Sequence, residues 1–172
     1  MRRVSIVQGE HKVIAEPNVV ISTLLGSCVA VCLQDPVARI GGMNHFLLSE
    51  PGGDVIVRRE DQQRYGVHAM ELLINAMMAE GASRSRLRAH LYGGANLIAG
   101  LGRIGSSNAA FAREFMSTEG IEIGRCELEG TRARKVEFMP YEGRVRSTLI
   151  ESAPPLRTAA APEMAGGDVE LF

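Results

Sequence analysis

Long apolar runs, an excess of charge of one sign and an even set of cysteines are all missing from this sequence of 172 residues. No apolar stretch approaches the roughly 20 residues that a membrane-spanning helix needs. The formal net charge of −1 argues against nucleic acid or an anionic membrane as the main partner. Lysine is scarce as well, with only Lys12 and Lys135, which we attribute to genomic bias rather than to function.

The three cysteines, Cys28, Cys32 and Cys126, are an odd number, which does not fit a disulfide scaffold. The first residues are basic, but polar residues from Gln8 onward follow too soon for the apolar core of a signal peptide. Free thiols in a reducing compartment are the better interpretation, and we expect a cytoplasmic protein.

Helical and strand-like patterns alternate along the chain, whose 45% hydrophobic and 23% charged residues are typical of a globular domain. Apolar residues spaced by three and four predict a helix over residues 61–80, and a second helix begins with Ser107 or Asn108 as its cap and ends at Gly120. Nine short apolar runs lie at 4–7, 13–15, 18–25, 28–33, 43–48, 88–92, 121–128, 135–139 and 145–150, and we expect roughly seven strands from them.

These elements predict an α+β fold, a single-domain layered α/β sandwich with mostly antiparallel strands and two main helices. From Ser152 onward the chain is rich in Pro, Ala and Gly and has little to bury. We therefore expect one domain over residues 1–151 and a flexible C-terminal tail over 152–172.

Cys28 and His45 are the pair that points to chemistry. A hairpin that turns about Pro36 and Val37 pairs residues whose numbers add up to 73, so Cys28 lies directly opposite His45. Directly opposed side chains have Cβ atoms about 4.5–5.5 Å apart, within reach of a hydrogen bond from thiol to imidazole. A bulge at Gly41–Gly42 would shift this register.

A thiol beside a cationic imidazole has a lowered pKa and becomes a nucleophile, and Gly26 and Ser27 let nearby amides turn toward a developing oxyanion. The alternative is that Cys28 is one more small residue of the core, as Cys126 is expected to be. A zinc site is disfavoured, because in a strand Cys32 lies about 13 Å from Cys28.

Several motifs in this order resemble the CheD family of chemoreceptor glutamine deamidases. The most specific is Gly26-Ser27-Cys28-Val29, with His45 seventeen residues after the cysteine. Similar stretches over about residues 4–150 are Gly9-Glu10, Asp35-Pro36, Gly42-Met43-Asn44, Gly93-Gly94-Ala95-Asn96, Ile104-Gly105 with Asn108, and Thr131 to Val136.

The resemblance implies an α/β sandwich with a Cys–His–Thr triad, in which Cys28 is the nucleophile and His45 the general base. The family's threonine lies six residues before the cysteine, where this chain has Ser22, so Ser22 is the expected third residue. Thr23 takes that role if the alignment slips by one position.

The implied enzyme is a cysteine-dependent protein-glutamine glutaminase. It converts glutamine side chains of methyl-accepting chemotaxis receptors to glutamate, releases ammonia and needs no metal or organic cofactor. A CheC-type phosphatase is a further implied partner, with no nucleic acid and no insertion into the membrane. The alternative is a regulatory adaptor that binds receptors and the phosphatase without catalysis.

Residues 100–105 match the Gly-x-Gly-x-x-Gly pattern of dinucleotide-binding loops. In that motif the first glycine directly follows a strand, whereas here five residues intervene after Gly94. We interpret these glycines as part of a loop near the catalytic pocket.

Overall fold

The computed structural model describes residues 1–48, 58–97 and 103–151, and these contain nine strands, two α-helices and one short 3-10 helix. The strands are β1 (Arg2–Ser5), β2 (His11–Ile14), β3 (Val19–Leu25), β4 (Val29–Asp35), β5 (Ile40–Asn44), β6 (Arg88–Gly93), β7 (Glu122–Leu128), β8 (Arg134–Met139) and β9 (Arg144–Leu149). The helices are α1 (Arg59–Ala79), η1 (Arg84–Arg86) and α2 (Ile104–Glu119).

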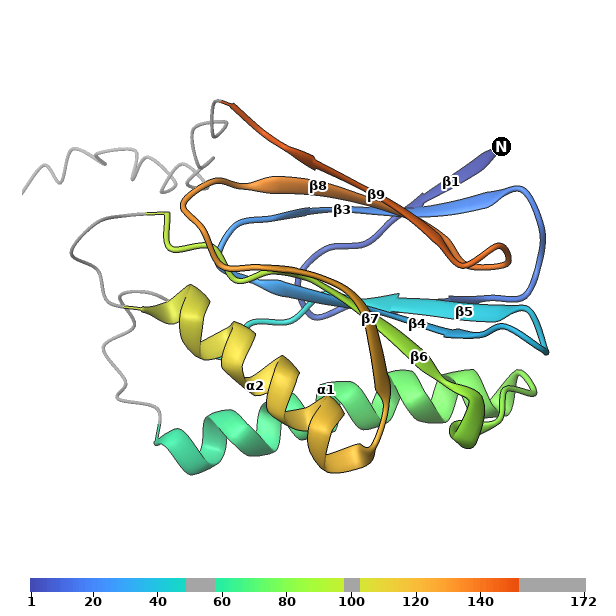
Figure 1. Ribbon diagram of the computed structural model, residues 1–172, viewed down its shortest axis with the longest axis horizontal. Coiled ribbons are helices and arrows are strands. Elements are labelled where there is room, and N and C mark those ends of the chain that lie inside the picture. The colour runs from blue at the N-terminus through green and yellow to red at the C-terminus, as the bar shows by residue number, and fades with distance from the viewer. Residues whose placement is uncertain (49–57, 98–102, 152–172) are drawn as a thin grey trace, which may run out of the picture.

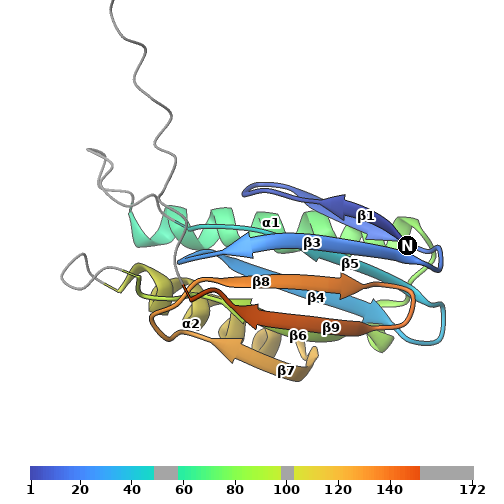
Figure 2. The ribbon, with the colours of Figure 1, turned by 90° about the horizontal axis from the view of Figure 1, so that it is seen from above.

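The elements are arranged in three layers, with one sheet above a second sheet and both long helices below it (Figure 1). The upper sheet has the strand order β1-β3-β8-β9, and Figure 2 shows these strands side by side from above. The lower sheet has the order β2-β5-β4-β6-β7, with α1 packed on β2 and β5 and α2 on β4, β6 and β7. Among the strands of the described residues only the pairs β1/β3 and β6/β7 are parallel, so the predicted α+β layered sandwich with mostly antiparallel strands is confirmed.

The strand β4 is buried on both faces, because it lies in the middle layer. Val29, Val31 and Leu33 pack into the core shared with the helices. Ala30 and Cys32 point the other way, into the core between the two sheets. A strand covered on both sides has a continuous apolar sequence without alternation, which is the pattern from Cys28 to Leu33.

Both predicted helices are present, with shifted starts. The first begins at Arg59 instead of Asp61. The second begins at Ile104, with Arg103 as its N-cap, so the expected cap at Ser107 or Asn108 is wrong. The helix extends further because its first turn packs closely on the chain after β6, where a Cβ on Gly105 would lie 2.3 Å from the Ala95 carbonyl oxygen. Its predicted end is confirmed, since Gly120 is the left-handed C-cap with a φ of 66°.

The described residues contain nine strands instead of about seven, because both short apolar pieces near the N-terminus form strands of their own, β1 and β2. Cys126 was expected in the core, but it is exposed because β7 lies at an edge of the lower sheet. The predicted tail, 152–172, lies outside the described residues. Among the described residues no helix is long and apolar enough to span a membrane.

Asp35 ends β4 and is fully buried. Its carboxylate accepts hydrogen bonds from the backbone N–H groups of Val37, Ala38 and Ser83 at 2.8–3.1 Å. Both nitrogens Nε and Nη2 of Arg86 also donate to it, at 2.8–3.1 Å. The Arg86 guanidinium and these N–H groups hold the pKa of Asp35 well below its usual range, although burial acts in the opposite direction. One carboxylate thus joins the β4–β5 turn to η1.

We expect Asp35→Asn to destabilise the fold by about 2 kcal/mol, because it removes the charge that these donors require. The matched control is Glu122→Gln, which breaks the solvent-exposed pair with Arg88 and leaves stability nearly unchanged. Urea denaturation of both variants measures the difference. Equal midpoints for the two variants would contradict this role of Asp35.

Candidate active site

The β4–β5 hairpin places Cys28 and His45 differently from the prediction. Its partners have numbers that add up to 75, as in Cys32 with Met43 and the bridge of Val29 with Phe46. The expected sum of 73 is therefore wrong, because the turn contains four residues instead of two. Since the shift is two residues, Cys28 and His45 still lie on the same face of the hairpin, but diagonally rather than directly opposite. The ladder runs through Gly41 and Gly42 without a bulge.

The segment before β4 is held by three consecutive carbonyl groups. The carbonyl oxygen of Gly26 accepts from the N–H of Ala95 at 3.0 Å, and that of Cys28 from the N–H of Gly94 at 2.8 Å. The oxygen of Ser27 accepts from the Asn108 side chain at 2.8 Å. Because C=O and N–H point in opposite directions across a trans peptide, the N–H groups of Ser27 and Cys28 face away from these anchors.

Asn108, which the sequence offered as a possible helix cap, holds the segment before β4 instead. It is buried inside α2, and its Oδ1 also accepts from the N–H of Leu48 at 3.1 Å. It therefore ties the segment around Cys28 to the helix layer. The signal was present in the sequence, since Asn108 shares one helix face with the apolar residues Phe111 and Phe115.

His45 is buried, and its Nδ1 lies 2.8 Å from the hydroxyl oxygen of Thr23. The same hydroxyl donates its single proton to the carbonyl oxygen of Ile6 at 2.8 Å. The hydroxyl must then accept from His45, which assigns the ring proton to Nδ1. Nε2 is left with its lone pair and is buried without a hydrogen-bond partner among the described residues.

Ser22, the residue expected to orient the imidazole, lies beside this contact without making it. Side chains alternate along β3, where Ile21 and Leu25 face the other sheet together with Thr23, and Ser22 faces away with the exposed Leu24. The contact with His45 is therefore made by Thr23, the alternative that the sequence left open.

Cys28 and His45 are both uncharged in this structure at neutral pH. Burial raises the pKa of the Cys28 thiol to about 11, although its own backbone N–H acts to lower it. Burial lowers the pKa of His45 to about 4, against the opposite effect of the Glu10 carboxylate. Both shifts favour the uncharged forms, so the resting pair is thiol and imidazole rather than thiolate and imidazolium.

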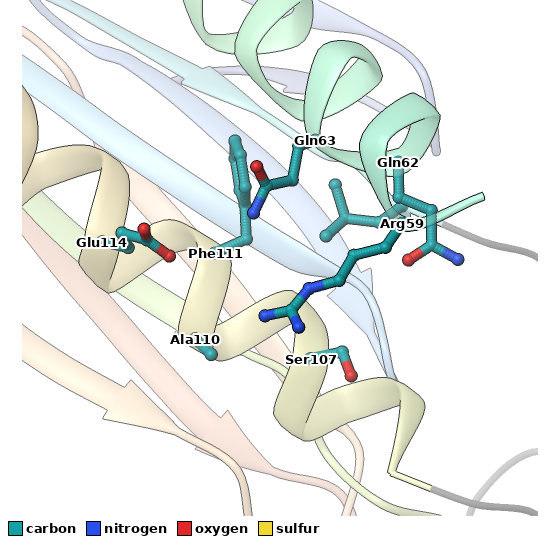
Figure 3. A pocket seen from close by; sticks show the side chains of 8 residues that line it. Arg59, Gln62, Gln63, Ser107, Ala110, Phe111 and Glu114 are labelled. Carbon is teal, nitrogen blue, oxygen red and sulfur yellow. The ribbon is translucent and has the colours of Figure 1, made fainter.

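Two cavities deserve comparison with this site. One of about 150 Å³ adjoins His45 and lies between the residues that follow β1, the end of β5 and one face of α1. A larger cleft of about 460 Å³ lies between α1 and α2, and Figure 3 shows Arg59 and Gln63 on one side of it and Ser107, Phe111 and Glu114 on the other. Neither Cys28 nor His45 lines this cleft, so it is separate from the candidate active site.

The sequence also raised a metal site and a dinucleotide-binding glycine pattern, and both were disfavoured there. Within the described ranges no three His, Cys, Asp or Glu side chains are grouped so that they could hold a metal ion. The glycine pattern at 100–105 lies largely outside the described residues. Its last glycine, Gly105, begins α2 and packs against the backbone after β6.

A thiol, an imidazole with an unpartnered nitrogen and an orienting hydroxyl, gathered at one end of an α+β sandwich, are the groups with which thiol hydrolases work. Comparison with known proteins identifies the family. The family model described as CheD chemotactic sensory transduction matches residues 47–148. This chain belongs to the CheD family.

Three relatives match nearly the whole chain, including the segment from Cys28 to His45 that precedes the family-model match. Proteins from Zymomonas mobilis, Agrobacterium fabrum and Caulobacter vibrioides are 51%, 47% and 49% identical to it. Each alignment covers 99% of this chain and 93%, 97% and 93% of the relative, respectively. All three carry the name "Probable chemoreceptor glutamine deamidase CheD".

The protonation state of His45 is directly measurable. By ¹⁵N NMR of histidine-labelled protein, we expect His45 to carry its proton on Nδ1 and to titrate near pH 4 instead of the ordinary 6.5. Because the unfolded chain binds this proton below pH 6.5 and the folded chain does not, His45 contributes stability above pH 6.5 that is lost as the pH falls toward 4. A midpoint near 6.5, or a proton on Nε2, would contradict the assigned state.

Proposed function

We propose that this chain is a protein-glutamine deamidase acting on chemoreceptors, with Cys28 as nucleophile and His45 as general base. The observation that carries the proposal is the hydrogen bond from His45 Nδ1 to Thr23, which leaves Nε2 as an unpartnered base in the site that contains a thiol. The names of relatives with about half of their residues identical supply the substrate, a glutamine of a chemoreceptor.

The reaction begins when the Cys28 sulfur attacks the carboxamide carbon of the substrate glutamine, while His45 Nε2 takes the thiol proton. The N–H groups of Ser27 and Cys28 donate to the oxyanion, since they face away from the anchored carbonyls of the same segment. His45 then gives the proton to the carboxamide nitrogen of the substrate and the C–N bond breaks. Ammonia departs, and the substrate carbonyl stays bound to Cys28 as a thioester.

Hydrolysis of the thioester completes the cycle. His45 removes a proton from a water molecule while the water oxygen attacks the thioester carbon. The C–S bond then breaks, and His45 returns the proton to the Cys28 sulfur. The product is a glutamate in place of glutamine, so a neutral side chain of the receptor becomes negatively charged. The receptor thereby gains a carboxylate that a methyltransferase can esterify.

Thr23, rather than Ser22, is the third member of the site in this proposal. Its hydroxyl accepts from Nδ1 and fixes the ring with Nε2 as the base, so it acts as a positioning residue through His45. Three statements stay predictions from the sequence: a CheC-type phosphatase partner, a cytoplasmic location and, as the alternative, a purely adaptor role.

The variants that test the proposal are Cys28→Ala, His45→Ala and Thr23→Val, with Ser22→Ala as the matched control. We expect no turnover for the first, a loss of more than about a hundredfold for the second and about a hundredfold for Thr23→Val, because the valine has the same shape but no hydroxyl. Ser22→Ala is expected to stay within about twofold, since its side chain lies on the other face of β3.

Deamidation is measured by mass spectrometry of a receptor fragment, as the conversion of amide to acid at glutamine. Thr23→Ser tests whether the hydroxyl that orients His45 matters more than the size of the side chain at this position. It keeps the hydroxyl and should therefore retain most of the activity. If wild type does not deamidate the fragment, the proposed function is wrong. If Ser22→Ala is inactive and Thr23→Val is active, the assignment of the third residue is wrong.

A further inference from the structure

The turn between β1 and β2, residues 7–10, is fixed on the segment that carries His45. The N–H of Gly9 donates to the carbonyl oxygen of His45 at 2.8 Å, and the N–H of His45 donates to that of Glu10 at 3.1 Å. The Glu10 carboxylate closes the turn by accepting from the N–H of Val7 at 2.9 Å. Gly9 has a φ of 88°, which other residues adopt only with strain. The backbone on both sides of Gln8 is therefore held in place.

From this turn the Gln8 side chain reaches the thiol. Its carbonyl oxygen Oε1 accepts a long hydrogen bond from Cys28 Sγ at 3.8 Å. Gln8 is solvent-exposed, so it approaches the sulfur from the side that a substrate also has to use. The group in contact with the thiol is a glutamine carboxamide, chemically the same group that the proposed reaction attacks.

We infer that the carboxamide of Gln8 occupies the place of the substrate carboxamide in the resting enzyme, so that a substrate glutamine has to displace it. This inference rests on the proposed function. It explains why the thiol proton is directed to Gln8 while His45 Nε2 has no partner among the described residues. The nucleophile and the base engage each other only when Gln8 has moved aside.

Gln8 also affects the reactivity of the thiol before any substrate is bound. A carbonyl oxygen that accepts from S–H stabilises the neutral thiol and opposes its ionisation. Removal of this acceptor should increase the thiolate fraction at a given pH. A carboxylate in its place should decrease that fraction below the wild-type value. The signs of these two effects are opposite, so two variants of one residue test the contact.

A second role for Gln8 gives a different result and is therefore distinguishable. If its amide NH₂ group donated to the oxyanion, Gln8→Ala would lower kcat by about a hundredfold. If Gln8 instead competes with the substrate for the site, Gln8→Ala lowers KM and leaves kcat nearly the same.

The experiment compares Gln8→Ala and Gln8→Glu with wild type, and Gln63→Ala serves as the control because Gln63 is another exposed glutamine that lines the separate cleft between the helices. Alkylation of Cys28 by iodoacetamide is followed near neutral pH by peptide mass spectrometry, which separates it from the exposed Cys126. The kcat and KM for deamidation of a receptor fragment are measured in parallel.

For Gln8→Ala we expect alkylation of Cys28 to be about threefold to tenfold faster and KM to be lower by a similar factor, as the loss of one hydrogen bond predicts. Gln8→Glu should alkylate more slowly than wild type, and Gln63→Ala should behave like wild type. Unchanged alkylation and KM in Gln8→Ala, or a large loss of kcat, would overturn the inference while leaving the proposed function intact. An absence of deamidation by wild type would overturn the proposed function instead, and the alkylation rates would still report on the Gln8 contact.

Discussion

The burial of β4 on both faces is the constraint on which the rest of the structure depends. One face packs against the helices and the other against the second sheet, so a shift of the strand by one residue would exchange the two sets of side chains. Asp35 fixes one end of the strand to the turn and to η1. Cys28 directly precedes the other end, where its carbonyl is anchored to the chain after β6. The position of the nucleophile thus follows from the packing of the middle layer.

The polar site at this end of the sandwich depends on one chain of hydrogen bonds. A buried imidazole requires partners, because an unpaired polar group in an apolar surrounding is costly. Thr23 and the Ile6 carbonyl satisfy one nitrogen and thereby set the orientation of the ring. The other nitrogen, Nε2, is among the few buried side-chain atoms of the described residues that have no hydrogen-bond partner.

The sequence predicted the layered fold and the shared face of Cys28 and His45, because both depend on periodicity. The register was wrong by two residues, since the turn is longer than the two-residue turn assumed and has Arg39 at a φ of 55°. The choice between Ser22 and Thr23 depends on which face of β3 meets the other sheet, and two adjacent hydroxyl residues carry no such information. The contact of Gln8 arises from a turn that packs on a distant segment, and local sequence does not encode it.

In the proposed mechanism Cys28 forms a covalent bond to the substrate carbonyl carbon, with His45 as the base. The most direct measurement is intact and peptide mass spectrometry of the enzyme, quenched in acid during single turnover of a receptor fragment. The account predicts a transient adduct with the mass of the fragment less one ammonia, attached to Cys28 and absent in Cys28→Ala. An adduct on Cys32 or Cys126, or deamidation that proceeds in Cys28→Ala, would contradict it.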